Sequence, residues 1–300
     1  MHNASGIYRI KVEIMAIRKI LVSLSGADSD APTVGMAMTI AKSFGGQVVG
    51  LFVRPDPREA LPYLGEAVSG QIVEQLIEAT QAGSDSLSAH ARAALEKAAG
   101  AAGVPVVEKS SADQLPSARY VDVVGNRDDV VMEASRLSDL VVFSESDNAK
   151  VGGSALEAAL KMADRPVLIV PDNAGATVGT HVAIGWDRSQ EAAQAIIAAI
   201  PFLAKAQQIK VFCIAEHARD KSPRTRLTDY LALHGVTAEI EFVDGGGKPD
   251  GEVLIDEAKK MSSDLIVMGG YGHIPWRKLL VSSTTEYVQS HAAIPILMAH

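Results

Sequence analysis

The sequence predicts two α/β domains in tandem, each built on a parallel β-sheet that helices cover on both faces. Short apolar runs alternate with longer helical patterns, which is typical of βαβ units, and the same succession occurs twice. The length of 300 residues suits two domains because single hydrophobic cores stop growing beyond roughly 250–300 residues. Only 5% of the residues are aromatic, which favours strands buried between helices over a β-sandwich.

The expected strands follow the same order in both halves. In the first half they are Ile17–Leu24, Gln47–Val53, Val104–Glu108, Leu140–Phe143 and Val167–Val170. In the second half they are His181–Trp186, Ile209–Ile214, Glu239–Val243, Leu265–Met268 and Ile296–Ala299. Helical patterns lie between them at Ala31–Phe44, Leu87–Ala102, Asp129–Leu137, Gln190–Leu203 and Gly251–Met261.

Short motifs at matching places support a duplication. The segment Ser138-Asp139-Leu140-Val141 recurs as Ser263-Asp264-Leu265-Ile266 around the start of the fourth strand of each half. Before the fifth strand, Arg165-Pro166-Val167 matches Ile294-Pro295-Ile296. Because these motifs occur in the same order, duplication explains them better than chance does.

The two halves are joined by a small, polar, glycine-bearing linker, Asp172–Thr177. We therefore expect domain 1 at residues 1–173 and domain 2 at residues 177–300. Domain 1 has a long insertion, residues 54–104, between its second and third strands, where the second half has only residues 215–236. We expect a helical hairpin over the sheet here, and a lid or a partner-binding surface is the alternative.

Composition excludes several classes of protein. The formal net charge of −8 argues against nucleic-acid binding, because phosphate backbones select basic surfaces. No apolar run approaches the roughly 18 residues of a membrane span, and Met1–Met15 lacks the apolar core and cleavage site of a signal peptide. The single cysteine, Cys213, cannot form an intramolecular disulfide, and the histidines have no metal-ligand spacing. A cytoplasmic protein without a metal site is expected.

A candidate site lies at the ends of the first and fourth strands of the second half. In open parallel sheets, ligands bind beyond the carboxyl ends of the strands, where the strand order reverses. The first strand ends in Trp186-Asp187-Arg188-Ser189, and the fourth ends in Met268-Gly269-Gly270-Tyr271-Gly272-His273. An acidic side chain can accept hydrogen bonds from ribose hydroxyls, and glycines let backbone N–H groups approach phosphate oxygens.

These motifs resemble the universal stress protein family, over nearly the whole chain. After the fourth strand, the ATP-binding members of that family carry Gly, two residues, Gly, nine residues and then Gly-Ser or Gly-Thr. Gly269 and Gly272 supply the first part here, and nine residues follow, but Ser282 stands where the last glycine is expected. Asp187-Arg188-Ser189 is similar to the family's Asp-Gly-Ser, again with the glycine replaced.

The resemblance implies two flavodoxin-like, Rossmann-like three-layer sandwiches, each with five parallel strands in the order 3-2-1-4-5. It implies that the last strands of the two halves pair edge to edge, so that one chain is an intramolecular pseudo-dimer; further pairing of whole chains is left open. The implied ligand is ATP with Mg²⁺, or another adenine nucleotide. The implied nucleotide-binding residues are Asp187, Ile214, Gly269, Gly270, Gly272, His273, Ser282, Ser283 and Thr284. A capping box, Ser283-Thr284-Thr285-Glu286, explains Ser283 without any ligand.

The first half departs further from the family. Ser25 stands where the aspartate is expected, since Leu24-Ser25 aligns with Trp186-Asp187. Glu145 and Asp147 occupy the place of the glycine cluster, and their negative charges would repel a triphosphate. We therefore expect the first half not to bind ATP in the manner of the family.

Three functions follow, in order of preference. The first is a regulatory protein of the universal stress type that binds ATP or another adenine nucleotide in its second domain. The second is a nucleotide-free interaction or scaffold module of the stress response with the same fold and an unidentified protein partner. A slow ATPase comes third, because no general base can be named, so no catalytic residue is assigned.

Overall fold

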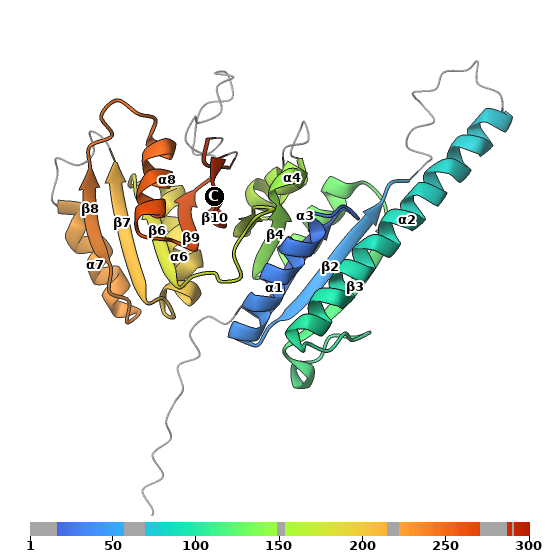
Figure 1. The fold of residues 1–300 in the computed structure, drawn as a ribbon, viewed down its shortest axis with the longest axis horizontal. Coiled ribbons are helices and arrows are strands. Elements are labelled where there is room, and N and C mark those ends of the chain that lie inside the picture. The colour runs from blue at the N-terminus through green and yellow to red at the C-terminus, as the bar shows by residue number, and fades with distance from the viewer. Residues whose placement is uncertain (1–16, 57–69, 149–153, 215–221, 271–286, 290) are drawn as a thin grey trace, which may run out of the picture.

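The computed structural model describes residues 17–56, 70–148, 154–214, 222–270, 287–289 and 291–300 (Figure 1). Its strands form one sheet in the order β3-β2-β1-β4-β5-β10-β9-β6-β7-β8. The strands of the first half are β1 Lys19–Leu24, β2 Gln47–Arg54, β3 Ser117–Val124, β4 Leu140–Ser144 and β5 Val167–Val170. Those of the second half are β6 His181–Gly185, β7 Gln208–Ile214, β8 Glu239–Val243, β9 Leu265–Gly269 and β10 Ile296–Ala299. All pairs within a half are parallel, so the predicted order 3-2-1-4-5 is confirmed in both halves.

The two halves join through an antiparallel pair between β5 and β10. Leu168 lies directly opposite Leu297 in this pair, and both side chains are fully buried. The predicted edge-to-edge contact of the last strands is therefore confirmed. It merges the two expected five-stranded sheets into a single ten-stranded mixed sheet.

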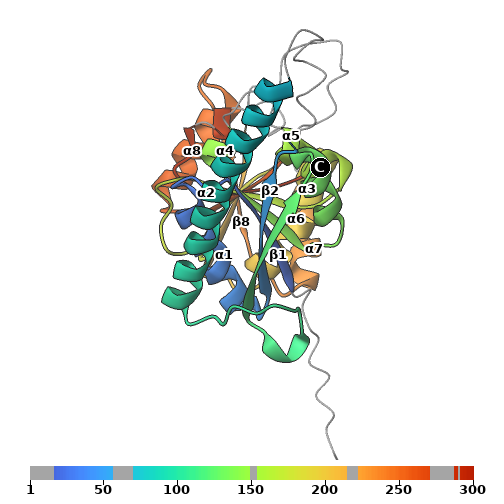
Figure 2. The same ribbon diagram turned by 90° about the vertical axis from the view of Figure 1, so that its right-hand side faces the viewer.

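Helices cover both faces of this sheet, and Figure 2 shows α2 and α3 on opposite sides of β2. The helices are α1 Asp30–Phe44, α2 Gly70–Ala102, α3 Arg127–Arg136, α4 Glu145–Asn148, α5 Ser154–Glu157, α6 Gln190–Leu203, α7 Ser222–Leu233 and α8 Asp250–Lys260. A 3₁₀ turn, η2, spans Ala112–Gln114 and a π turn, η3, spans Ala158–Met162. One hydrophobic cluster lies under α1, α2, α6 and α7, and the other under α3, α5, η3 and α8. Each cluster contains residues of both halves, so the core is continuous across them.

The predicted third strand, Val104–Glu108, is wrong. Among the described residues, its one sheet contact is an isolated bridge between Val106 and Ala118, while Ser117–Val124 pairs with β2 along its full length. Pro105 has no N–H to donate within a ladder. The true strand escaped notice because it is an edge strand whose side chains are mostly half-buried and partly polar, rather than an apolar run. The connection from β2 to β3 is correspondingly longer than predicted.

The helices α4, α5 and α7 were not among the named helical patterns, and the remaining differences concern where elements begin and end. The first strand begins at Lys19 rather than Ile17, and the helix predicted from Asp129 begins at Arg127. Asn126 explains the earlier start of this helix, since its side-chain oxygen accepts the N–H of Asp128 at 3.0 Å. The helix predicted from Leu87 extends back to Gly70 as one continuous helix. Residues 57–69 lie outside the described part, so the predicted helical hairpin stays a prediction.

The aspartate of the repeated Ser-Asp motif has the same role in both halves. Asp139 accepts hydrogen bonds from the backbone N–H groups of Arg18 and Lys19 at 2.8 and 2.9 Å. Asp264 likewise accepts the two N–H groups at the start of β6, at 2.8 and 2.9 Å. Each aspartate thereby fixes the register of the first strand beside the fourth strand, which accounts for the recurrence of the motif.

Candidate functional site

The described members of the predicted site lie at one edge of the sheet. The strand β6 pairs with β9 on one side and with β7 on the other, which is the point where strand order reverses. Asp187 follows β6, Ile214 ends β7, and Gly269 and Gly270 stand at the end of β9. The parallel registers bring all four residues to the carboxyl edge of the second half.

Asp187 is exposed at this edge, and one of its carboxylate oxygens is engaged. Its Oδ1 accepts the backbone N–H of Ser189 at 2.9 Å, and the Ser189 hydroxyl caps α6 by accepting the N–H of Ala192 at 3.0 Å. Within the described part of the chain, Asp187 Oδ2 accepts no hydrogen bond. The loop therefore holds the carboxylate in place and leaves one oxygen able to accept a ligand hydroxyl, beside the N-terminus of α6.

Arg188 occupies a left-handed backbone conformation, with φ of 70°. Its counterpart in the first half, Gly26, has φ of 80°, which supports the alignment of Ser25 with Asp187. A non-glycine residue in this conformation costs roughly 1–2 kcal/mol. The backbone turn that the resemblance assigns to a glycine is thus present here with an arginine.

The two glycines at the end of β9 are closely surrounded by protein atoms. A Cβ at Gly269 would lie 2.7 Å from the Ala192 backbone N and 2.9 Å from Glu191 Cβ, in the first turn of α6. At Gly270 a Cβ would lie 3.0 Å from Leu160 Cδ2 of the first half and 3.3 Å from Met298 Cβ. Packing alone therefore requires glycine at Gly269 and favours it at Gly270, a reason that the motif did not suggest.

The remaining predicted site residues lie outside the described part of the chain. They are Gly272, His273, Ser282, Ser283 and Thr284, and the predicted capping box at Ser283 falls there as well. The described geometry thus concerns the ends of β6, β7 and β9.

The matching loop of the first half is closed onto itself. The carboxylate of Asp30, which is 2% exposed, accepts the backbone N–H groups of Ser25 at 3.0 Å and Gly26 at 2.8 Å. It also accepts the Ser25 hydroxyl at 3.1 Å. A Cβ at Gly26 would lie 2.5 Å from the backbone oxygen of Leu87, so α2 rests directly on this loop. Neither contact could be predicted from the sequence, because Asp30 and Leu87 belong to no motif that indicates a contact with this loop.

Next to this loop, Arg54 holds a polar network that sequence reasoning also missed. Its guanidinium donates to both carboxylate oxygens of Asp122, at 2.7 and 2.8 Å, and to Asp85 of α2. The Ser88 hydroxyl donates to Asp122 at 2.5 Å. Burial raises the pKa of Asp122, but the hydrogen bonds from Arg54 and Ser88 outweigh it and hold this pKa below its usual value. The network ties α2 to the ends of β2 and β3.

Glu145 stands at the carboxyl edge of the first half, directly after β4. Burial, together with the nearby negative charge of Asp172, raises the pKa of Glu145 above its usual value. Both effects disfavour the charged form of Glu145. That this edge repels a triphosphate stays a prediction.

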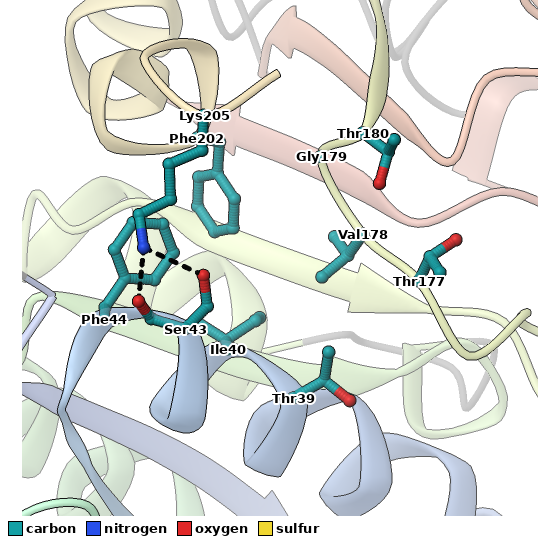
Figure 3. A pocket seen from close by; sticks show the side chains of 10 residues that line it. All are labelled: Thr39, Ile40, Ser43, Phe44, Thr177, Val178, Gly179, Thr180, Phe202 and Lys205. Carbon is teal, nitrogen blue, oxygen red and sulfur yellow. Dashed lines mark hydrogen bonds between the residues drawn. The ribbon is translucent and has the colours of Figure 1, made fainter. Parts of the chain in front are cut away.

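A cavity of about 150 Å³ lies between α1, α6 and the linker, away from Asp187 (Figure 3). The rings of Phe44 and Phe202 meet edge to face across it, with centroids 5.2 Å apart. Lys205 Nζ stands 4.5 Å from the centre of the Phe44 ring and donates to Ser43 of α1. These contacts join the two halves on the face of α1 and α6, and they provide no recognisable ligand chemistry.

Neither a metal cluster nor a membrane-spanning helix occurs in the described ranges. In these ranges, no three or more His, Cys, Asp or Glu side chains are grouped so that they could hold a metal ion. No helix in them combines the length and the apolar character that crossing a membrane requires.

Comparison with known proteins gives a family match in the second half and a fold match over the whole chain. The sequence profile of the Universal stress protein family matches residues 180–300. A universal stress protein from Archaeoglobus fulgidus DSM 4304 is similar in structure over 94% of this chain and 97% of its own, with 15% identity and a TM-score of 0.66. A functionally unknown protein from Pseudomonas aeruginosa PAO1 is similar over 94% of this chain and 92% of its own, with 15% identity and a TM-score of 0.54. No curated protein sequence matches the chain.

Proposed function

We propose that this chain is a regulatory protein of the universal stress type that binds ATP or another adenine nucleotide in its second domain, on the premise that residues 180–300 match the model of that family. The observation that carries the proposal is the carboxylate of Asp187. It is exposed at the strand-order reversal, held by Ser189, and retains an oxygen without a hydrogen bond in the described residues. We take domain 2 to be residues 177–300.

The chemistry of the neighbouring groups supports a nucleoside at this edge. Asp187 Oδ2 would accept a ribose hydroxyl, as the acidic residue of a dinucleotide fold does. Ile214, partly buried at the end of β7, offers an apolar wall for a base. The N-terminus of α6 lies beside Asp187 and favours negative charge nearby. The phosphates, with Mg²⁺ held chiefly by their own oxygens, would face Gly272, His273, Ser282, Ser283 and Thr284.

The contrast between the halves supports a single site per chain. In the first half, Asp30 accepts the hydrogen bonds that the loop after β1 can donate, and Leu87 lies against Gly26. Ser25 also lacks the carboxylate that Asp187 provides. A nucleotide in the first half would have to displace both α2 and an internal hydrogen-bond set.

One observation favours a second candidate, a nucleotide-free interaction module with the same fold. The close packing around Gly269 and Gly270 explains both glycines without a phosphate. In that case the fold serves an unidentified protein partner. A slow ATPase ranks third, since we assign no catalytic residue.

Calorimetric titration of the nucleotide-free protein with ATP and Mg²⁺, and separately with AMP, decides between the first two candidates. We expect one nucleotide per chain. Asp187→Ala should weaken binding by at least about tenfold, because a hydrogen bond to a charged group contributes roughly 1.5–3 kcal/mol. Ser25→Ala, the matched change in the first half, should leave the affinity unchanged.

Each result of the titration favours one candidate function over the other or contradicts the assignment of the site. Absence of heat with both nucleotides favours the interaction module over the nucleotide-binding protein. Two equivalent sites per chain, or equal effects of the two variants, would show that the assignment to the second half is wrong. Circular dichroism of each variant confirms that a loss of binding is not a loss of folding.

A further inference from the structure

The helix α2 is longer than the sheet that it covers. It has 33 residues and is therefore about 50 Å long, whereas the eight residues of β2 span about 26 Å. Among the residues of α2 whose burial is described, the buried positions begin at Ser84 and continue with Ser88, Ala91, Leu95 and Ala99. Figure 1 shows the N-terminal part of α2 extending past the end of the sheet. We call this part, Gly70–Gly83, the overhang.

The overhang continues the core-facing stripe of α2 beyond the core. Val73 and Ile77 lie on the same helical face as Ser84 and Ser88, at spacings close to the helical repeat, and both are half-buried. Beside this stripe, Ile72 is 56% exposed. Neither hydrophobic cluster of the described residues includes a residue of the overhang. A helix of this length gains little stability in water without packing of its apolar face, so the stripe indicates a docking surface.

The charges of the overhang are all negative. Glu74 and Glu78 are exposed and flank the stripe, and the segment contains no lysine or arginine. The next acidic residue, Asp85, is paired with Arg54 and belongs to the polar network of the first half. The surface therefore combines an apolar stripe with two carboxylates that form no ion pair with any described residue.

A second copy of this chain is a poor occupant. Two overhangs in contact would bring Glu74 and Glu78 of one copy close to the same residues of the other, and like charges repel. A helix with the opposite charge removes this repulsion and adds favourable ion pairs.

We propose that the overhang docks a basic amphipathic helix of a partner protein. Apolar residues of that helix, spaced by three and four positions, would pack on Val73 and Ile77, and its lysines or arginines would face Glu74 and Glu78. The surface lies in the first half, so this inference does not depend on nucleotide binding by the second half.

The test uses the full chain and a fluorescent probe peptide of roughly 18 leucines and lysines arranged with helical periodicity. Fluorescence anisotropy should show binding that the same residues in scrambled order do not reproduce. The double variant Val73→Asp, Ile77→Asp should weaken binding at least about tenfold. The matched control Gln71→Asp, Gln75→Asp adds the same two charges on the polar face and should bind at least as tightly as the wild type.

The two double variants distinguish apolar docking from general charge attraction. If attraction alone were responsible, both would bind more tightly, and the proposal would be overturned. Glu74→Gln with Glu78→Gln should weaken binding and reduce its dependence on salt; an unchanged affinity would also contradict the proposal. Sedimentation measures whether the free chain self-associates. Self-association that disappears in the double variant Val73→Asp, Ile77→Asp would assign the surface to a second copy instead and overturn the proposal. Circular dichroism checks that each variant is folded.

Discussion

Replacing Leu168 or Leu297 with alanine tests how strongly the β5–β10 pair holds the two halves together. Both side chains are 0% exposed and lie opposite each other in register. Each substitution removes three carbon groups, worth about 0.8 kcal/mol each, and the cavity left behind raises the cost further. We therefore expect each variant to lose about 3–4 kcal/mol of the free energy of unfolding.

Urea denaturation followed by circular dichroism measures this loss. Leu137→Ala is the matched control, because Leu137 is 83% exposed and its truncation should change the free energy of unfolding by no more than about 0.5 kcal/mol. Limited proteolysis within Asp172–Thr177 gives a second measurement, since looser halves expose the linker. Cleavage there should be faster in Leu168→Ala and Leu297→Ala than in the control.

The double variant provides the sharper result. Since the two side chains face each other, removing both should cost less than the sum of the single losses, by about 0.5 kcal/mol or more. Strict additivity, or single losses below about 1 kcal/mol, would refute the view that this contact stabilises the pair of halves.

Three further outcomes are expected in the same denaturation assay. Gly26→Ala should lower the free energy of unfolding by more than about 1 kcal/mol, because Gly26 has a positive φ and the α2 backbone lies against it. Gly35→Ala, in open space within α1, should raise it by about 0.5–1 kcal/mol. The reverse order of stabilities would contradict the packing described. Arg188→Gly should raise stability by up to about 1 kcal/mol by relieving the left-handed strain, and a clear loss would show that the side chain outweighs it. Arg54 and Ser88 lower the pKa of Asp122, so the stability that this carboxylate contributes is present above its unfolded pKa, about 3.9, and is lost as the pH falls through the folded value. Asp122→Asn should therefore flatten the dependence of the free energy of unfolding on pH in this range. Identical pH profiles of the variant and the wild type would contradict this.

Much of the fold could be predicted because most strands are buried on both faces. Runs such as Leu140–Phe143 and Leu265–Met268 are apolar without interruption, and helices of clear periodicity separate them. The edge strand Ser117–Val124 lacks this signal, since Arg119 and Asp122 interrupt it, so the apolar run at Val104 was mistaken for the strand. The order of strands came from the family resemblance, because local patterns do not encode which strands become neighbours.

The candidate site could be predicted only in part. The place of Asp187 follows from the rule that ligands bind where strand order reverses, and the structure brings it to the same edge as Gly269. The close packing around the glycines could not be predicted, because Leu160 and Gly270 are distant in sequence. The closure of the first half by Asp30 and by Leu87 likewise depends on tertiary contacts that leave no motif.

The antiparallel pairing of β5 and β10 within one chain also determines how many copies of each surface the molecule displays. A symmetric dimer of separate chains displays every surface twice and must keep both copies compatible with its own assembly. Here the two halves are covalently joined, so their pairing does not depend on protein concentration. The amino-acid sequence of each half can also differ from that of the other half. The overhang of α2 accordingly occurs once per pair of halves, and so does the open loop around Asp187. With the proposed helix site in the first half and the proposed nucleotide site in the second, one chain would bind one helix and one nucleotide at a time.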